Sequence, residues 1–88
     1  MKIKDGYILR KVAGEWIVVA IGPASVSFNK MVRLNETSKF VWNLLENEIN
    51  ETQLVQSITD EYDVSEELAS RDVKNIINQF TEIGCIEV

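Results

Sequence analysis

Runs of β-branched, aromatic and alternating apolar residues predict three strands in the first part of the chain. These strands cover about residues 7–12 (YILRKV), 15–21 (EWIVVAI) and 30–34 (KMVRL). The second contains an unbroken apolar run from Trp16 to Ile21, which is typical of a strand buried on both faces and therefore central. The third strand is then an edge of the sheet, with unpaired backbone N–H and C=O groups along one side.

The segments between these strands indicate an antiparallel meander in chain order. Lys2 and Lys4 lead into the first strand. Ala13–Gly14 joins the first two strands, either as a two-residue turn or as a bulged loop of about three or four residues. Gly22–Pro23 ends the second strand, because proline cannot donate a backbone hydrogen bond to a sheet. Residues 24–30 fit either a loop or the early part of the third strand.

After the third strand the apolar period becomes that of a helix. Three helices are expected, at about residues 36–47, 51–62 and 66–83. Each of them follows a residue whose side-chain oxygen can accept a hydrogen bond from a free N–H of the first turn, and these N-cap residues are Asn35, Asn50 and Ser65.

The end of the sequence completes the predicted fold. Gly84 stands where a left-handed residue commonly ends a helix, and residues 85–88 could add a short closing strand. The fold class is therefore α+β, a single domain over residues 1–88. It consists of an N-terminal three-stranded antiparallel meander followed by three helices, in the order of a winged helix-turn-helix.

Charge is unevenly distributed between the strands and the helices. Of the formal net charge of −5, residues 1–34 contribute +4 from six basic and two acidic side chains, and residues 35–88 contribute −9 from three and twelve. Phosphate binding depends on contacts from Lys and Arg, so acidic helices argue against a nucleic-acid partner. The alternative is that these charges only solvate the surface.

The sequence carries no signal for a membrane or for export. No apolar run approaches the roughly 18 residues of a membrane helix. The first residues, MKIKDGYIL, lack the apolar region and cleavage site of a signal peptide. The single cysteine, Cys85, excludes an internal disulfide and fits a cytoplasmic protein.

Candidate catalytic and metal-binding residues are missing from the sequence. There is no histidine, so Ser-His and Cys-His nucleophile pairs cannot form, and one cysteine with carboxylates is far from the usual zinc ligand set. The four glycines are scattered and make no phosphate-binding loop. Cys85 is expected to be a small buried residue, and Trp16 and Trp42 to lie in or at the edge of the core. We therefore expect no enzyme activity, no cofactor and no metal.

A second face of the last helix lies outside its apolar core stripe. This face combines basic, polar and apolar side chains, and it consists of Arg71, Lys74, Ile77, Asn78 and Thr81. Such a mixed face is often only solvated surface. It is of interest here because the free third strand could lie beside it.

Several segments resemble the PqqD family, which is named from the pyrroloquinoline quinone synthesis protein D. These segments are LNETSKFVW at residues 34–42, the following Leu44–Leu45, EYDVS at 61–65 and FTEIGCIEV at 80–88. The first segment is the most specific, and the likeness runs from about Tyr7 to the end of the sequence. The family's usual Gly after Asn-Glu-Thr is Ser38 here, and its usual Leu after the late Gly is Cys85.

The resemblance implies a recognition element for ribosomally synthesised and modified peptides. Such modules bind the leader segment of a precursor peptide and present it to a modifying enzyme, often a radical SAM enzyme. The leader adds as a strand to the third strand and packs against the third helix. Carried onto this sequence, the peptide-binding residues are Lys30, Met31, Val32, Arg33, Leu34, Arg71, Lys74, Ile77, Asn78 and Thr81. Lys30 and Arg33 would attract an acidic leader.

Two other functions compete with this interpretation. A winged-helix DNA-binding regulator would need a basic recognition helix, whereas residues 66–82 hold four acidic and two basic side chains. The second competing function is that of a scaffold or regulatory subunit that binds no peptide. An exposed edge strand can also pair with a second copy, so both a monomer and a homodimer are compatible with the sequence.

Overall fold

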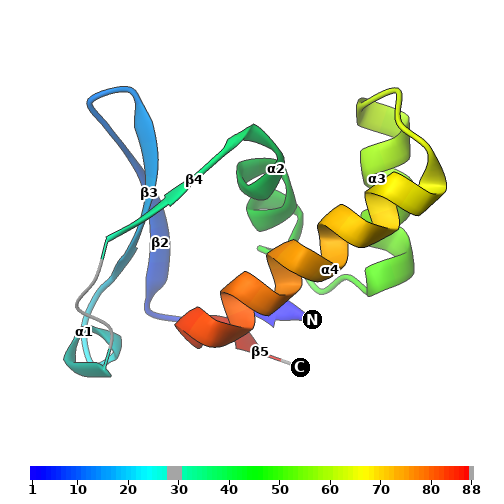
Figure 1. Cartoon of the computed structure of the whole chain (residues 1–88). Coiled ribbons are helices and arrows are strands. Elements are labelled where there is room, and N and C mark those ends of the chain that lie inside the picture. The colour runs from blue at the N-terminus through cyan, green and yellow to red at the C-terminus, as the bar shows by residue number, and fades with distance from the viewer. Residues whose placement is uncertain (28–30, 88) are drawn as a thin grey trace.

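The computed structural model describes residues 1–27 and 31–87 (Figure 1). Its strands are β1 (Lys2–Ile3), β2 (Tyr7–Val12), β3 (Glu15–Ala20), β4 (Val32–Leu34) and β5 (Ile86–Glu87). Its helices are α1 (Ala24–Ser27), α2 (Glu36–Leu44), α3 (Glu51–Glu61) and α4 (Glu66–Ile83). The predicted start of the third strand, at residue 30, lies outside the described residues.

β2, β3 and β4 form an antiparallel sheet in this order, with β3 in the centre and β4 at an edge. This confirms the predicted α+β fold, the central second strand and the exposed third strand. In β3 the successive residues Ile17 and Val18 are both buried, although their side chains point to opposite faces. The sheet lies on one side of the molecule and α2, α3 and α4 lie on the other, with β4 running directly into α2 (Figure 1).

A two-residue turn joins β2 to β3, which selects one of the two predicted connections. Val12 lies opposite Glu15, and the two residues between them have positive φ angles of 50° at Ala13 and 81° at Gly14. This is the geometry of a type I′ turn, whose twist matches that of the strands it connects. Ala13 is an uncommon residue at such a φ.

Two short elements were not predicted as such from the sequence. Instead of leading into the first strand, Lys2 and Ile3 form the separate strand β1, which pairs with β5. β5 is the short closing strand expected within residues 85–88. Only two residues of each strand pair, and the partners are far apart in the sequence, so no local pattern indicates β1 or its pairing with β5. The other element is α1, which occupies most of the segment expected to be loop or strand. There the Ser25 side chain donates to the Gly22 backbone oxygen over 2.7 Å.

The beginnings of the three long helices agree with the predicted N-caps. The side-chain oxygens of Asn35, Asn50 and Ser65 accept from backbone N–H groups three residues later, at 2.8, 2.8 and 3.1 Å. Gly84 ends α4 in the left-handed conformation, with φ 86°. α2 ends at Leu44, before the predicted residue 47. Leu45 is its C-cap, and the residues after it form a turn.

The core lies between the inner face of the sheet and the helices. Trp42 of α2 and Phe80 of α4 meet there edge to face, with ring centroids 5.5 Å apart. Val18 of β3 and Leu54 of α3 are completely buried in the same cluster. This core fixes the rotation of α4 about its axis and thereby decides which of its faces lies toward β4.

Candidate functional site

β4 pairs with the sheet on one side only, and the turn between β2 and β3 determines which of its backbone groups are free. In a two-residue hairpin the closing residues, here Val12 and Glu15, form a hydrogen-bonded pair, and such pairs then alternate along the strands. The Ile21 N–H donates to the Gly6 oxygen over 2.7 Å, which agrees with this alternation. Odd-numbered β3 residues therefore bond to β2.

Even-numbered β3 residues direct their backbone groups toward β4. These are Trp16, which lies opposite Leu34, and Val18, which lies opposite Val32. Val32 and Leu34 thus hold β4 to the sheet. Arg33 lies between them, so its N–H and C=O point away from the sheet at the open edge. Added backbone would pair at Arg33.

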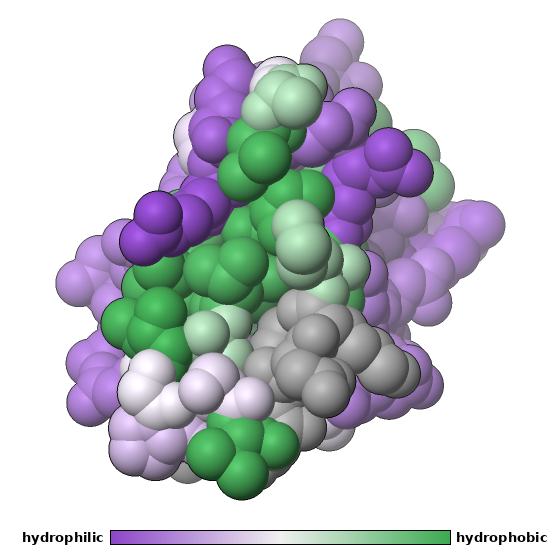
Figure 2. All heavy atoms as spheres, turned by 90° about the vertical axis from the view of Figure 1, so that its left-hand side faces the viewer, coloured by the Kyte–Doolittle hydropathy of each residue, from purple (hydrophilic) through white to green (hydrophobic). Residues whose placement is uncertain are grey.

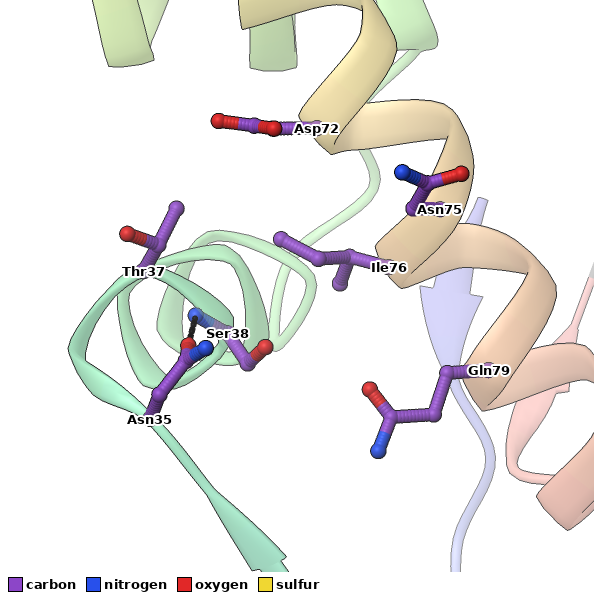
Figure 3. Close-up of a pocket in the computed structure, with 7 residues that line it drawn as sticks. All are labelled: Asn35, Thr37, Ser38, Asp72, Asn75, Ile76 and Gln79. Carbon is purple, nitrogen blue, oxygen red and sulfur yellow. Dashed lines mark hydrogen bonds between the residues drawn. The ribbon is translucent and has the colours of Figure 1, made fainter.

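A groove lies between the β4–α2 junction and α4. One hollow of about 280 Å³ is lined by Asn35, Thr37, Ser38, Asp72, Asn75, Ile76 and Gln79 (Figure 3). A second, of about 380 Å³, is lined by Glu15, Arg33, Leu34, Asn35, Ser38 and Gln79. The two hollows share three lining residues, so together they form one depression that follows β4, and we call it the β4–α4 groove.

The wall formed by α4 has an apolar centre with polar neighbours. In Figure 3 the Ile76 side chain points from α4 toward Ser38 at the start of α2. Gln79 lies one turn along the helix on the sheet side, and Asp72 lies one turn the other way. Ser38 is buried, whereas Asp72 and Gln79 are partly exposed. An extended chain could place an apolar side chain against Ile76 and make polar contacts on either side.

The charges of the groove are separated along its length. Asp72 lies in the hollow near Thr37, and Arg33 lies in the hollow beside β4. The Arg33 side chain is 3.4 Å from the Glu15 carboxylate, and both groups are exposed, so solvent weakens this ion pair. The lining residues thus offer one unpaired carboxylate, at the Asp72 end. A bound peptide with a basic residue at that end would complement it.

The predicted face of the last helix does not line this groove. None of Arg71, Lys74, Ile77, Asn78 and Thr81 contributes to either hollow. At about 100° per residue, Lys74 and Asn78 lie about 160° from Ile76 around the helix, on the far side from the groove. Their contact with a peptide stays a prediction, and the geometry gives it no support.

Sequence reasoning missed Asp72, Asn75 and Gln79, which form the groove wall with Ile76. A signal for them does exist. They lie next to the buried stripe of Ala69, Val73, Ile76 and Phe80, on one side of it, at a spacing of three and four residues. The hydrophobic pattern alone could not show which flank of that stripe faces β4.

The remaining predicted positions lie mostly on β4. Val32 and Leu34 point to the inner side of the sheet, where Leu34 is buried and Val32 is partly buried. Met31 immediately precedes the strand and is exposed. Lys30 lies outside the described residues.

Other candidate groups behave as core or surface. Trp42 is buried, as predicted, and Trp16 is partly buried, with the Lys39 ammonium 4.6 Å and the Lys11 ammonium 5.5 Å from its ring centre. Cys85 is buried, and burial raises the pKa of its thiol to about 11. A protonated, buried thiol is a poor nucleophile.

The described part of the chain holds no cluster of three or more His, Cys, Asp or Glu side chains suited to a metal ion. Within the same residues no helix combines the length and apolar character needed to cross a membrane.

Comparison with known proteins gives a family and two similar structures. The family model described as "Coenzyme PQQ synthesis protein D (PqqD)" matches residues 15–86. The structure of "TbiB1 in Complex with the TbiA(beta) Leader Peptide" is similar with a TM-score of 0.78 at 21% identity, over 99% of this chain and 95% of that chain. "Lasso peptide synthetase B1 complexed with the leader peptide" is similar with a TM-score of 0.74 at 18% identity, over 96% and 93%. No curated protein matches the sequence.

Proposed function

Because the chain belongs to the PqqD family, we propose that it is a non-catalytic recognition element that binds the leader segment of a ribosomally synthesised precursor peptide. The single observation that carries this proposal is the open edge of β4 beside a groove whose other wall is α4. Both structures with a similar fold are complexes with leader peptides, which supports it further.

The leader binds as an added strand on β4. Its backbone pairs with the outward N–H and C=O of Arg33, and alternate side chains enter the β4–α4 groove. An apolar leader side chain packs against Ile76, between Asp72 and Gln79. Affinity comes mainly from the backbone pairing, while specificity comes from the residues that line the groove.

The recognition element delivers the leader to a separate modifying enzyme, of which a radical SAM enzyme is the expected class. It works in the cytoplasm, as a monomer or as a homodimer through an edge strand. A DNA-binding role is less favoured because residues 66–82, which include most of α4, hold four acidic and two basic side chains.

Calorimetric titration with the leader of the precursor encoded beside this chain tests the proposal. We expect one site per chain and a dissociation constant on the order of micromolar, because the interface is small. A leader with the same composition in scrambled order is the control. The absence of saturable binding, with the modifying enzyme either absent or present, would exclude the function proposed here.

A further inference from the structure

The outer face of the sheet, turned away from the helices, forms a second apolar surface. The strand registers place on this face side chains from all three strands and from the segment that follows β3. We call it the outer sheet face, and its apolar residues are Ile8, Val12, Ile17, Val19 and Ile21. Figure 2 shows hydrophobic residues forming a band down this side of the molecule, with hydrophilic residues on both sides.

α2, α3 and α4 lie on the other side of the sheet and do not cover this face (Figure 1). The partly buried apolar residues that pack against the core include Leu9 and Trp16 but none of the outer sheet face. Ile17 is buried yet also lies outside the core cluster. Two side chains at opposite ends of the face are nearly half exposed, Val12 at 46% and Ile21 at 47%. An apolar patch of this size also occurs on ordinary monomers, where the largest such patch is often functional.

Two arginines flank the centre of the outer sheet face. Arg10 and Arg33 lie opposite Ile17 from the two neighbouring strands, so one row across the sheet reads Arg10, Ile17, Arg33. Arg33 reaches Glu15, whereas Arg10 makes no salt bridge within the described residues. Arginine beside apolar side chains is typical of protein interfaces, where it pairs with a carboxylate of the partner.

Charge argues against a second copy of the chain as the occupant, and size argues against a stable interface with any partner. Two strands of six residues and one of three present a face of about 240 Å². An enzyme seated on this face would bury about 480 Å² in total, and so would two copies joined face to face; both values lie below the roughly 1,000 Å² expected of a stable interface, so the contact is transient. A pair of copies would gather four arginines against two glutamates. A transient partner with an apolar surface and a carboxylate fits better.

Position identifies that partner. Arg33 belongs to both sites: its backbone points to the open edge of β4, and its side chain lies on the outer sheet face. A protein seated on this face therefore lies next to the edge at which we propose that the leader binds, without covering α4. We propose that the outer sheet face docks the leader-modifying enzyme, through an apolar surface of that enzyme that carries a carboxylate opposite Arg10. This inference rests on the proposed function.

Two variants test the docking surface separately from leader binding. Ile21→Asp places a charge on the apolar face at an exposed position, and Arg10→Glu reverses the unpaired charge. Each should weaken binding of the modifying enzyme encoded beside this chain at least tenfold, while leader affinity changes less than about twofold. Leu68→Asp is the matched control, because Leu68 is an exposed apolar residue on α4 and off this face. Circular dichroism checks that each variant is folded.

The outcomes distinguish the two proposals. Unchanged enzyme affinity in both folded variants, or no enzyme binding by a wild-type protein that does bind leader, overturns the docking surface and leaves the proposed function standing. Enzyme binding that depends on Ile21 and Arg10, in a protein that binds no leader, supports the surface and overturns the leader-binding function. If sedimentation shows a wild-type dimer that Ile21→Asp dissociates, the occupant is a second copy, and the enzyme proposal is overturned.

Discussion

Asn35 takes part in two features at once. Its side chain accepts from the Ser38 N–H at 2.8 Å and caps α2, and the same residue lines both hollows of the groove. Asn50 caps α3 in the same way but lies away from the groove. The chain therefore contains a matched pair of caps, of which only one is in the candidate site.

Replacing either asparagine by alanine should lower the free energy of unfolding by about 1 kcal/mol, the usual cost of losing an N-cap. Only Asn35→Ala should also weaken leader binding, by about fivefold, because one polar contact in the groove is lost. Urea denaturation and calorimetric titration measure the two effects. Equal leader affinity in the two variants would show that Asn35 only caps the helix.

Asp72 is expected to select the charge of the leader. Asp72→Asn should lower the affinity for a leader that has a basic residue at that end of the groove. The expected loss is about threefold to tenfold at low salt, because an exposed ion pair contributes about 1 kcal/mol. The difference should shrink as salt is added. Asp63→Asn removes the same charge at an exposed position between α3 and α4 and should have no effect. Salt-independent loss would point to a role other than charge pairing.

Ionisation of the Cys85 thiol should make the free energy of unfolding depend on pH in the alkaline range. Burial raises the pKa of its thiol from 9.0 to about 11, so below pH 9 folded and unfolded chains both keep the proton and stability is complete. Between these values the unfolded chain loses the proton and the folded chain keeps it. The free energy of unfolding therefore falls as pH rises, by up to about 3 kcal/mol.

Cys85→Ala should lack this part of the alkaline loss. Burial also raises the pKa of Tyr62, whose contribution is present in both proteins and cancels in the comparison. Urea denaturation at pH 7, 9 and 10 measures the difference. Parallel pH profiles of the two proteins would mean that Cys85 is not protected from ionisation in the folded state.

At the scale of elements, alternate residues of β4 have different roles: some bond to β3, and others face the open edge. Val32 and Leu34 bond to β3, and Arg33 presents its backbone to the open edge. A proline removes an N–H, so its effect depends on which way that N–H points. Consecutive positions of the same strand should therefore give opposite results.

Arg33→Pro should stay folded and weaken leader binding at least tenfold relative to Arg33→Ala, which controls for the lost side chain. Val32→Pro should instead lower the free energy of unfolding by about 1–3 kcal/mol, because it removes a bond to β3 and leaves the opposing carbonyl without its donor. Calorimetry and urea denaturation separate the two cases. Arg33→Pro protein that binds leader as tightly as Arg33→Ala would refute strand addition at this edge.

The elements predicted from the sequence are those that local chemistry specifies. Asn35, Asn50 and Ser65 each cap a helix through a partner three residues away, so the signal and the bond lie in the same short segment. The edge position of β4 also followed from the chain order of the strands. The β1–β5 pair has no such signal, because Ile3 and Ile86 are distant in sequence.

The α4 wall shows why the site was only half predicted. The core stripe of α4 was correct, but a helix has two flanks beside its core stripe, and the sequence does not say which one lies next to β4. The mixed face that includes Lys74 and Asn78 was singled out in the sequence by its composition. The packing of Phe80 against Trp42 sets the rotation of α4, and that contact joins two elements.

At the scale of the whole molecule, the first residues connect distant elements. The Ile3 N–H donates to the Leu45 oxygen at the end of α2, and the Lys4 N–H donates to the Cys85 oxygen after α4, both over 2.8 Å. The Ile3 side chain is buried in the core cluster with Ile86. These contacts join the two ends of the chain to the helical layer.

Ile3→Ala should therefore lower the free energy of unfolding by about 2–4 kcal/mol, the range for a large apolar side chain removed from a core. Lys2→Ala changes the neighbouring residue of the same strand, which is exposed, and should cost less than about 0.5 kcal/mol. Urea denaturation measures both. A cost for Ile3→Ala no larger than that for Lys2→Ala would show that β1 is not part of the stable core.

The β1–β5 pair also has a consequence for how the fold can be joined to other proteins. Because these strands pair antiparallel, Lys2 lies beside Glu87, so the first and last strands lie side by side (Figure 1). Neither strand lines the β4–α4 groove or belongs to the outer sheet face. The unit can therefore be grafted onto another protein through either end, or inserted into one of its loops, from a single attachment point that leaves both surfaces accessible.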